Sequence, residues 1–202
     1  MSSSDCASLA SETEEQASSP LWREMRYGRV TASKLFEASR CTTSDGSLVN
    51  TILGVKEKDS VAMERGRRLE KAVLAVVSKN KQLKIKNIGL VLNDKLPIFG
   101  ASPDGVSEEY VLEVKCPMSE KSLPTYFSSD KTKPAEKYLA QIMMQMLMCN
   151  KKKGLFCVAS PTFETENTVT VLEVNLDNMY VQALMDRAKN FWVNSVFPKL
   201  LL

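Results

Sequence analysis

Strand and helix patterns alternate along this chain, and their order restricts the fold more than any other feature of the sequence. The expected helices span 21–25, 31–38, 47–53, 60–79, 135–149 and 177–196. The expected strands span 83–92, 98–101, 110–115, 155–159 and 168–174. Strands interleaved with helices in this order predict an α/β or α+β fold, with a mixed central sheet flanked by helices.

The first 19 residues differ in composition from the rest of the chain. They contain four acids (Asp5, Glu12, Glu14 and Glu15), no base, many serines and few large apolar side chains. Such a segment buries too little apolar surface to offset the entropy lost on ordering. We therefore expect a disordered acidic, Ser-rich tail over 1–19 and a single domain over 20–202, long enough for one substantial core.

Histidine is absent from the sequence. Without imidazole the chain cannot use Ser-His or Cys-His nucleophilic catalysis, and it cannot bind zinc through nitrogen. The five cysteines have no short paired spacing, so they indicate neither a disulfide framework nor a zinc or iron–sulfur site. Any hydrolysis therefore depends on carboxylates, lysine and metals that prefer oxygen ligands.

The charge and hydropathy of the chain restrict its partners and its location. The net charge is +3, and because the tail contributes four negative charges, the remainder carries +7 and favours a polyanionic partner. No apolar run approaches the roughly 20 residues of a membrane helix, and the N-terminus lacks the pattern of a secretory signal. We expect an intracellular protein with no membrane partner, nuclear in a eukaryotic setting and cytoplasmic in a phage or bacterial one.

The strand 110–115 carries two opposite charges on one face. Because side chains alternate along a strand, Glu113 and Lys115 project to one side while Leu112 and Val114 project to the other. A lone Glu-x-Lys pattern is most often an ion pair on a solvated face. Only its surroundings give it a functional meaning.

Those surroundings include a second carboxylate. The sequence Ser102-Pro103-Asp104-Gly105 places Asp104 at a tight turn, so the chain can fold back beside Glu113. Two facing carboxylates repel unless they are protonated or bridged by a cation, and such hard oxygen ligands select Mg²⁺ or Mn²⁺. The two strands therefore predict a metal site next to Lys115.

The helix 60–79, with Ser60 as its expected N-cap, supplies a third acid. One face consists of residues that recur at steps of three and four: Met63, Gly66, Glu70, Val73 and Val77. Glu70 should therefore point inward, where an unpaired carboxylate is costly and needs a cation or a base. The alternative is a salt bridge to Arg67 or Lys71, although both project elsewhere on the helix.

The Met-rich helix 135–149 has two stripes. The apolar stripe, which we expect in the core, comprises Leu139, Ile142, Met143, Met146 and Leu147. The adjacent stripe of Tyr138, Gln141 and Gln145 either lines the site or forms solvated surface.

Taken in order along residues 21–149, these motifs resemble the YqaJ-like viral recombinases. That family includes phage lambda exonuclease and related alkaline exonucleases and belongs to the PD-(D/E)XK nuclease superfamily. The matching motifs are Trp22, Arg26-x-Gly28, Thr31-Ala32-Ser33, Gly66-x-x-x-Glu70, Ser102-Pro103-Asp104-Gly105, Glu113-Val114-Lys115-Cys116-Pro117 and Tyr138-x-x-Gln141. The resemblance implies a restriction-endonuclease-like core within one exonuclease domain over 20–202. The acidic tail and Arg29 lie outside the pattern.

The resemblance also implies roles for the acids and the lysine. Asp104 and Glu113 would bind the metal together with the backbone carbonyl of Val114. Glu70 resembles the family's helix acid, which completes the metal site. Lys115 would position or activate water.

Further residues follow from the same resemblance. Gln141 matches the glutamine on the helix that follows the core and counts as a catalytic-site residue. Asp94 stands ten residues before Asp104 with no motif around it. Whether Asp94 and Gln145 join the site is left open.

The resemblance implies a 5′-phosphate site made by Arg26, Thr31 and Ser33. Their place at a helix N-terminus suits an anion. The alternative is that Thr31 is a simple helix cap and Arg26 a surface charge.

The implied activity is that of a Mg²⁺-dependent DNA nuclease, with Mn²⁺ as a substitute. It would be a 5′-to-3′ exonuclease on double-stranded DNA ends in recombination or DNA processing, with a homotrimer as the assembly and a single-strand annealing protein as a partner. One alternative is a structure-directed DNA endonuclease of the same superfamily. The other is a non-catalytic DNA-binding protein derived from a nuclease, although every expected acid and Lys115 are retained.

Overall fold

In the computed structural model, which describes residues 2–55 and 59–202, four strands form the central sheet. In spatial order they are β3 (Gly105–Val106), β4 (Tyr110–Lys115), β5 (Lys153–Ala159) and β6 (Val169–Asn175). The two central strands are parallel, and each outer strand is antiparallel to its neighbour. The predicted α/β fold with a mixed sheet is therefore confirmed.

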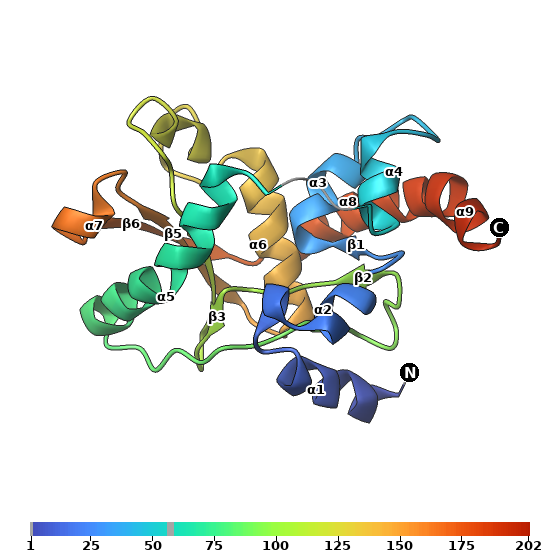
Figure 1. The fold of residues 1–202 in the computed structure, drawn as a ribbon, viewed down its shortest axis with the longest axis horizontal. Helices are drawn as coiled ribbons and strands as arrows, with labels where there is room; N and C mark the ends of the chain where they lie inside the picture. Colours follow the sequence, from blue (N-terminus) through green and yellow to red (C-terminus); the bar gives the residue numbers. More distant parts are fainter. Residues whose placement is uncertain (1, 56–58) are drawn as a thin grey trace.

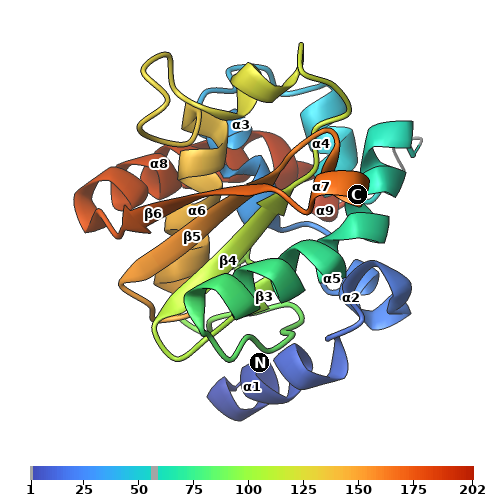
Figure 2. The same ribbon diagram turned by 90° about the vertical axis from the view of Figure 1, so that its left-hand side faces the viewer.

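A helix covers each face of this sheet, so the central strands β4 and β5 are buried on both sides. Helix α5 (Val61–Lys81) packs on the face that carries Leu112 and Val114. Helix α6 (Glu136–Met148) packs on the face that carries Val111 and Phe156, with α8 (Asn178–Phe191) beyond it. Figure 2 shows the sheet between α5 and α6. The alternation of side chains along β4 thus divides the core into two clusters.

The long elements lie within two residues of their predicted bounds. Helix α5 begins after Ser60, whose side chain accepts a hydrogen bond from the Met63 backbone N–H as predicted for an N-cap. Helix α8 continues as one π-helical stretch over Trp192–Val196. The remaining elements are α2 (Pro20–Glu24), β1 (Val30–Thr31), α3 (Leu35–Ala38), α4 (Ser47–Ile52), β2 (Phe99–Gly100), α7 (Phe163–Glu166) and α9 (Phe197–Leu200). In the part of the chain that the structure describes, no helix is both long enough and apolar enough to cross a membrane.

The prediction of a disordered tail is wrong for residues 3–12, which form helix α1 (Ser3–Glu12) (Figure 1). A capping box between Ser2 and Asp5 starts the helix. The few apolar residues of this segment lie on one face, where Cys6 and Leu9 are buried. Residues far along the chain supply the apolar partner, which composition alone could not reveal.

The partner of α1 is the segment predicted as a strand over 83–92, and that prediction is also wrong. Only isolated bridges occur there, from Lys86 to Val106 and from Val91 to Ala101. Two of the segment's backbone N–H groups are used elsewhere, since that of Gly89 donates to the carbonyl of Ala10 and that of Leu90 to Thr13 Oγ1. Contacts with the N-terminal segment therefore replace part of the expected strand ladder.

Two further predictions differ from the structure in detail. The strand predicted over 98–101 shortens to β2, and it pairs in parallel with β1 in a separate two-stranded sheet. The helix predicted over 31–38 begins as a 3-10 turn at Ala32–Lys34, and the Thr31 side chain makes no capping hydrogen bond.

Candidate active site

Glu113 lies at the centre of the polar cluster on β4. Its side chain points towards α6 and is buried, with only 2% of the residue exposed. Lys115 projects from the same face, and its Nζ lies 2.5 Å from Glu113 Oε1. The predicted sharing of one strand face by these two residues is observed, and the face is buried rather than solvated.

Helix α6 holds both oxygens of that carboxylate. Gln141 Nε2 donates to Glu113 Oε1, and Gln145 Nε2, one turn later, donates to Oε2, both at 2.6 Å. Gln145 is fully buried, at 0% exposure. Of the two alternatives for the Tyr/Gln stripe, the structure therefore places both glutamines against Glu113 rather than on a solvated surface. The spacing of four from Gln141 was the sequence signal for Gln145.

Asp104 meets β4 where the hairpin predicts it. Its Oδ2 accepts a hydrogen bond of 2.6 Å from the Val114 backbone N–H, and its own N–H donates to the Leu112 carbonyl. Burial raises the pKa of Asp104 well above its usual value, and the negative charges of Glu113 and Glu70 raise it further. The three acids are thus close enough to repel one another.

Glu70 is the half-buried acid that α5 contributes. Burial, followed by the charge of Glu113, raises the pKa of Glu70 to about 7, although Lys115 and Lys71 act in the opposite direction. The alternative of an Arg67 salt bridge is wrong, because Arg67 pairs with Asp59 at 3.0 Å. The inward face of α5 is also shorter than predicted, since Met63 is exposed.

Lys115 lies between the acids and an aromatic ring. Its Nζ is 5.3 Å from the ring centroid of Tyr138, which stacks on Tyr126 and Phe156. Burial lowers the pKa of Lys115, but Glu113 and Asp104 offset this effect, so the net shift of its pKa is upward. The group at the end of β4 is therefore a fixed ammonium ion.

The carboxylate oxygens of Asp104, Glu113 and Glu70 are ligands that a hard divalent cation prefers, although they are not arranged as a metal-binding group. Within residues 2–55 and 59–202, no group of three or more His, Cys, Asp or Glu side chains is arranged to hold a metal ion. The carboxylates of Asp104, Glu113 and Glu70 nevertheless raise the pKa of their neighbours, and a bound cation would relieve that repulsion. In their chemistry, the residues present therefore suit a divalent cation that prefers oxygen ligands.

The N-terminal segment supports the turn that carries Asp104. Trp22 Nε1 donates to Ser102 Oγ at 2.9 Å. Gln16 Nε2 donates to the carbonyls of Pro103, at 2.9 Å, and of Ile88. Sequence reasoning missed Gln16 because its partners lie more than 70 residues away.

The residues expected to bind a 5′-phosphate line one open pocket of about 810 Å³. Arg26 stacks over Trp22, with 3.8 Å between the guanidinium carbon and the ring centroid, and burial lowers the pKa of Arg26 to about 10. The hydroxyl oxygens of Thr31 and Ser33 lie 3.2 Å apart. Arg26 is thus packed against Trp22 and partly buried, which differs from a simple surface charge.

Asp94 lies apart from the three acids. Its Oδ2 accepts a hydrogen bond of 2.7 Å from Ser3 Oγ at the start of α1, and this bond lowers the pKa of Asp94. Of the two residues that the sequence leaves open, Asp94 thus lies next to α1 and Gln145 lies against Glu113.

A mixed sheet with Asp104 on a hairpin beside Glu113 and Lys115 is the arrangement that the sequence motifs predict. The sequence model of the YqaJ-like viral recombinase domain matches residues 1–152, and the chain belongs to that family. None of the curated proteins matches the chain.

Solved structures share the fold at low sequence identity. The alkaline exonuclease LHK-Exo from Laribacter hongkongensis has a TM-score of 0.72 and 22% identity, over 87% of this chain and 91% of that one. A phage-related exonuclease from Haemophilus somnus 129PT has a TM-score of 0.66 and 14% identity, over 88% of this chain and 99% of that one. The Shutoff and Exonuclease Protein of Kaposi's sarcoma-associated herpesvirus has a TM-score of 0.64 and 12% identity, over 96% of this chain and 73% of that one.

Proposed function

We propose that this chain is a Mg²⁺-dependent deoxyribonuclease, a 5′-to-3′ exonuclease on double-stranded DNA ends that acts in recombination or DNA processing. The observation that carries the proposal is the meeting of Asp104, Glu113 and Lys115 at β4 beside Glu70 of α5. Family membership supports it. Two proteins of similar structure also support it, since LHK-Exo has been solved with dAMP and the protein SOX with DNA.

Each polar residue of the cluster has a role in this proposal. Asp104, Glu113, Glu70 and the carbonyl of Val114 would hold the ion, with Mn²⁺ able to replace Mg²⁺. A bound divalent ion polarises the phosphate and lowers the pKa of water. The ammonium group of Lys115 orients the attacking water and stabilises the negative charge that develops on the phosphate.

Two glutamines of α6 hold the Glu113 carboxylate in place. Gln141 and Gln145 hold the two oxygens of Glu113 in one orientation, which preorganises the carboxylate before substrate binds.

The basic pocket supports a preference for DNA ends. A 5′-phosphate would accept hydrogen bonds from Arg26, Thr31 and Ser33, and a guanidinium ion with two hydroxyls suits a dianion. Assembly as a homotrimer, cooperation with a single-strand annealing protein and an intracellular location belong to the same proposal and rest on the family alone.

The decisive experiment compares linear duplex DNA, covalently closed circular DNA and RNA with Mg²⁺ or with EDTA. The proposal predicts mononucleotides from the linear duplex, no product from the circle and no cleavage in EDTA. Nicked circles would instead favour the endonuclease alternative. Tight DNA binding without cleavage in Mg²⁺ or Mn²⁺ would favour a non-catalytic DNA-binding protein.

A further inference from the structure

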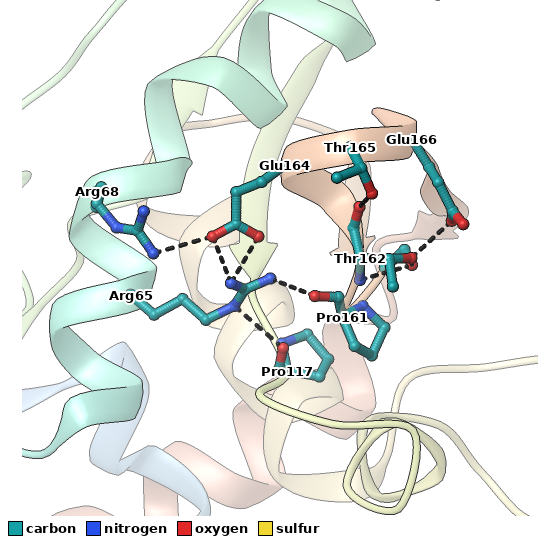
Figure 3. Close-up of polar contacts among 9 residues, drawn as sticks. Arg65, Arg68, Pro117, Pro161, Thr162, Glu164, Thr165 and Glu166 are labelled. Carbon is teal, nitrogen blue, oxygen red and sulfur yellow. Dashed lines mark hydrogen bonds and ion pairs between the residues drawn. The ribbon is translucent and has the colours of Figure 1, made fainter.

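Arg65, in the second turn of α5, is nearly enclosed by its neighbours (Figure 3). Its side chain is 10% exposed, against 45% for Arg67 and 62% for Arg68 on the same helix. A buried guanidinium is stable only where most of its N–H groups find acceptors. The contacts of Arg65 therefore show what it holds together.

Arg65 donates to three residues in two segments, one after β4 and one after β5. Its Nη1 lies 2.7 Å from both carboxylate oxygens of Glu164 on α7. Its Nη2 donates to the Pro161 carbonyl at 2.8 Å, and its Nε to the Pro117 carbonyl at 3.3 Å. Arg68 adds a bond of 2.9 Å to the same Glu164 carboxylate. The guanidinium group of Arg65 thus connects α5 to α7 and to the loops that carry Pro117 and Pro161.

The two carbonyl acceptors lie at the edge of the sheet where the acids act. Pro117 follows Lys115 by two residues, and Pro161 follows Ala159, the last residue of β5, by two. Because β4 and β5 are parallel, the segments that follow them leave the sheet at the same edge. The proline rings fix φ in both loops and so reduce the backbone freedom of the residues that carry these carbonyls.

Helix α5 otherwise meets the sheet through apolar contacts, including those of Leu69 and Val73. Apolar packing is not directional, so by itself it tolerates small slides and rotations of the helix. The directional bonds of Arg65 remove that freedom. Glu70 lies five residues further along the same helix, about 7.5 Å at 1.5 Å per residue, so a shift of α5 at Arg65 would also move the Glu70 carboxylate relative to Asp104 and Glu113.

We infer that Arg65 is a positioning residue that places Glu70 against the acids of β3–β4 and so sets the affinity of the site for its divalent cation. This inference rests on the proposed function, because it assigns Arg65 a role in that same metal site. A purely structural Arg65, which only fastens α7, would affect stability and leave metal affinity unchanged.

The test uses the full chain with Arg65→Lys, Arg65→Ala and Glu164→Gln. Arg68→Ala is the matched control, because it removes one arginine of the same helix and one bond to the same glutamate. Three quantities are measured for each variant: the Mg²⁺ concentration that half-saturates cleavage of a linear duplex, Mn²⁺ binding without DNA by electron paramagnetic resonance, and the thermal unfolding temperature. Methylguanidinium is added to the Arg65→Ala variant as a chemical rescue.

We expect Arg65→Lys and Arg65→Ala to raise the half-saturating Mg²⁺ concentration and to weaken Mn²⁺ binding by about 10- to 100-fold, the range for residues that orient metal ligands. Glu164→Gln should have a smaller effect in the same direction. Arg68→Ala should stay within about twofold of the wild type, as an exposed pair contributes little. Methylguanidinium should partly restore Mn²⁺ binding.

The inference would be overturned if Arg65→Lys and Glu164→Gln unfold at lower temperature but bind Mn²⁺ as the wild type does. If Arg65→Ala does not fold, the Mn²⁺ binding of these two variants is the test. The proposed function fails separately, if the wild-type chain leaves every DNA substrate intact. In that case the Mn²⁺ measurement without DNA still decides the role of Arg65.

Discussion

The amide nitrogen of Gln145 lies 2.6 Å from Oε2 of Glu113, and both side chains are enclosed between α6 and the sheet. Gln141 and Lys115 share the other oxygen, Oε1, so no carboxylate oxygen of Glu113 is left without a donor. The Gln145 Oε1 atom, by contrast, has no hydrogen-bond partner among the described residues. Gln145 therefore serves Glu113 more than it serves the stability of the fold.

Replacement of Gln145 by Leu should separate these two effects. The change removes one donor to a charged group but also removes the unpartnered Oε1, so the free energy of unfolding should change by less than about 2 kcal/mol. Cleavage of linear duplex should fall roughly 10- to 100-fold as Glu113 loses its orientation. The control is Gln182→Leu, an exposed glutamine on α8. Urea unfolding and initial rates give both quantities, and wild-type rates in Gln145→Leu would contradict the role.

Removal of the site's charges should abolish cleavage and leave DNA binding nearly intact. We expect this for Glu113→Gln, Lys115→Ala and Asp104→Asn, because duplex affinity depends on basic contacts with phosphates spread over the surface. Rates are measured with saturating Mg²⁺, and affinity by fluorescence anisotropy in EDTA. If Asp104→Asn kept most of the wild-type rate, the assignment of Asp104 to the metal site would be wrong.

The Arg26 pocket should distinguish two duplexes that differ only in their 5′ phosphate. The wild type should degrade the phosphorylated end faster. The Arg26→Ala variant should reduce that preference more than it reduces affinity for internal duplex, because Arg26 is one of the charged donors that line the pocket. The exposed Arg187 on α8 provides a matched Arg→Ala control. An equal rate of the wild type on both duplexes would rule out recognition of the 5′ end.

The contact between α1 and the segment around Gly89 can be tested by adding a single methyl group. A Cβ at Gly89 would overlap the backbone of Thr13, so Gly89→Ala should destabilise the fold by roughly 1–3 kcal/mol. A Cβ at Gly66 within α5 meets nothing within 4 Å, and Gly66→Ala should instead stabilise by about 0.5–1 kcal/mol. Urea unfolding measures both changes. Hydrogen exchange over residues 2–13 should rise only in Gly89→Ala, and unchanged exchange there would contradict the docking of α1.

Local sequence patterns were sufficient to predict β4 and α5, the elements that carry Glu113 and Glu70. The bounds of β4 agree with the prediction because apolar and charged residues alternate over 112–115, and this alternation also places Glu113 beside Lys115. Helix α5 has a three-to-four periodicity and a Ser cap, both of which are local signals. Sequence neighbours therefore specify the strand and the helix that meet at the site.

Long-range contacts account for what the sequence did not reveal. The order in α1 depends on Leu90 and Leu92, whose distance along the chain hides them from any local pattern. The carboxylate partner of Arg65 lies 99 residues away. An arginine on a helix surface resembles any solvated charge until the fold brings Glu164 to it.

The bond from Gln16 to the Pro103 carbonyl spans 87 positions, and it has a consequence for how the chain forms during translation. At about 5–20 residues per second, a ribosome needs roughly 4 to 17 s to add the residues between them, and the Gln16 side chain lacks this acceptor during that time. The turn that carries Asp104 acquires its support only after it is made, when the earlier residues Gln16 and Trp22 dock onto it. Residues that are synthesised before the turn thus take their place only once it has formed.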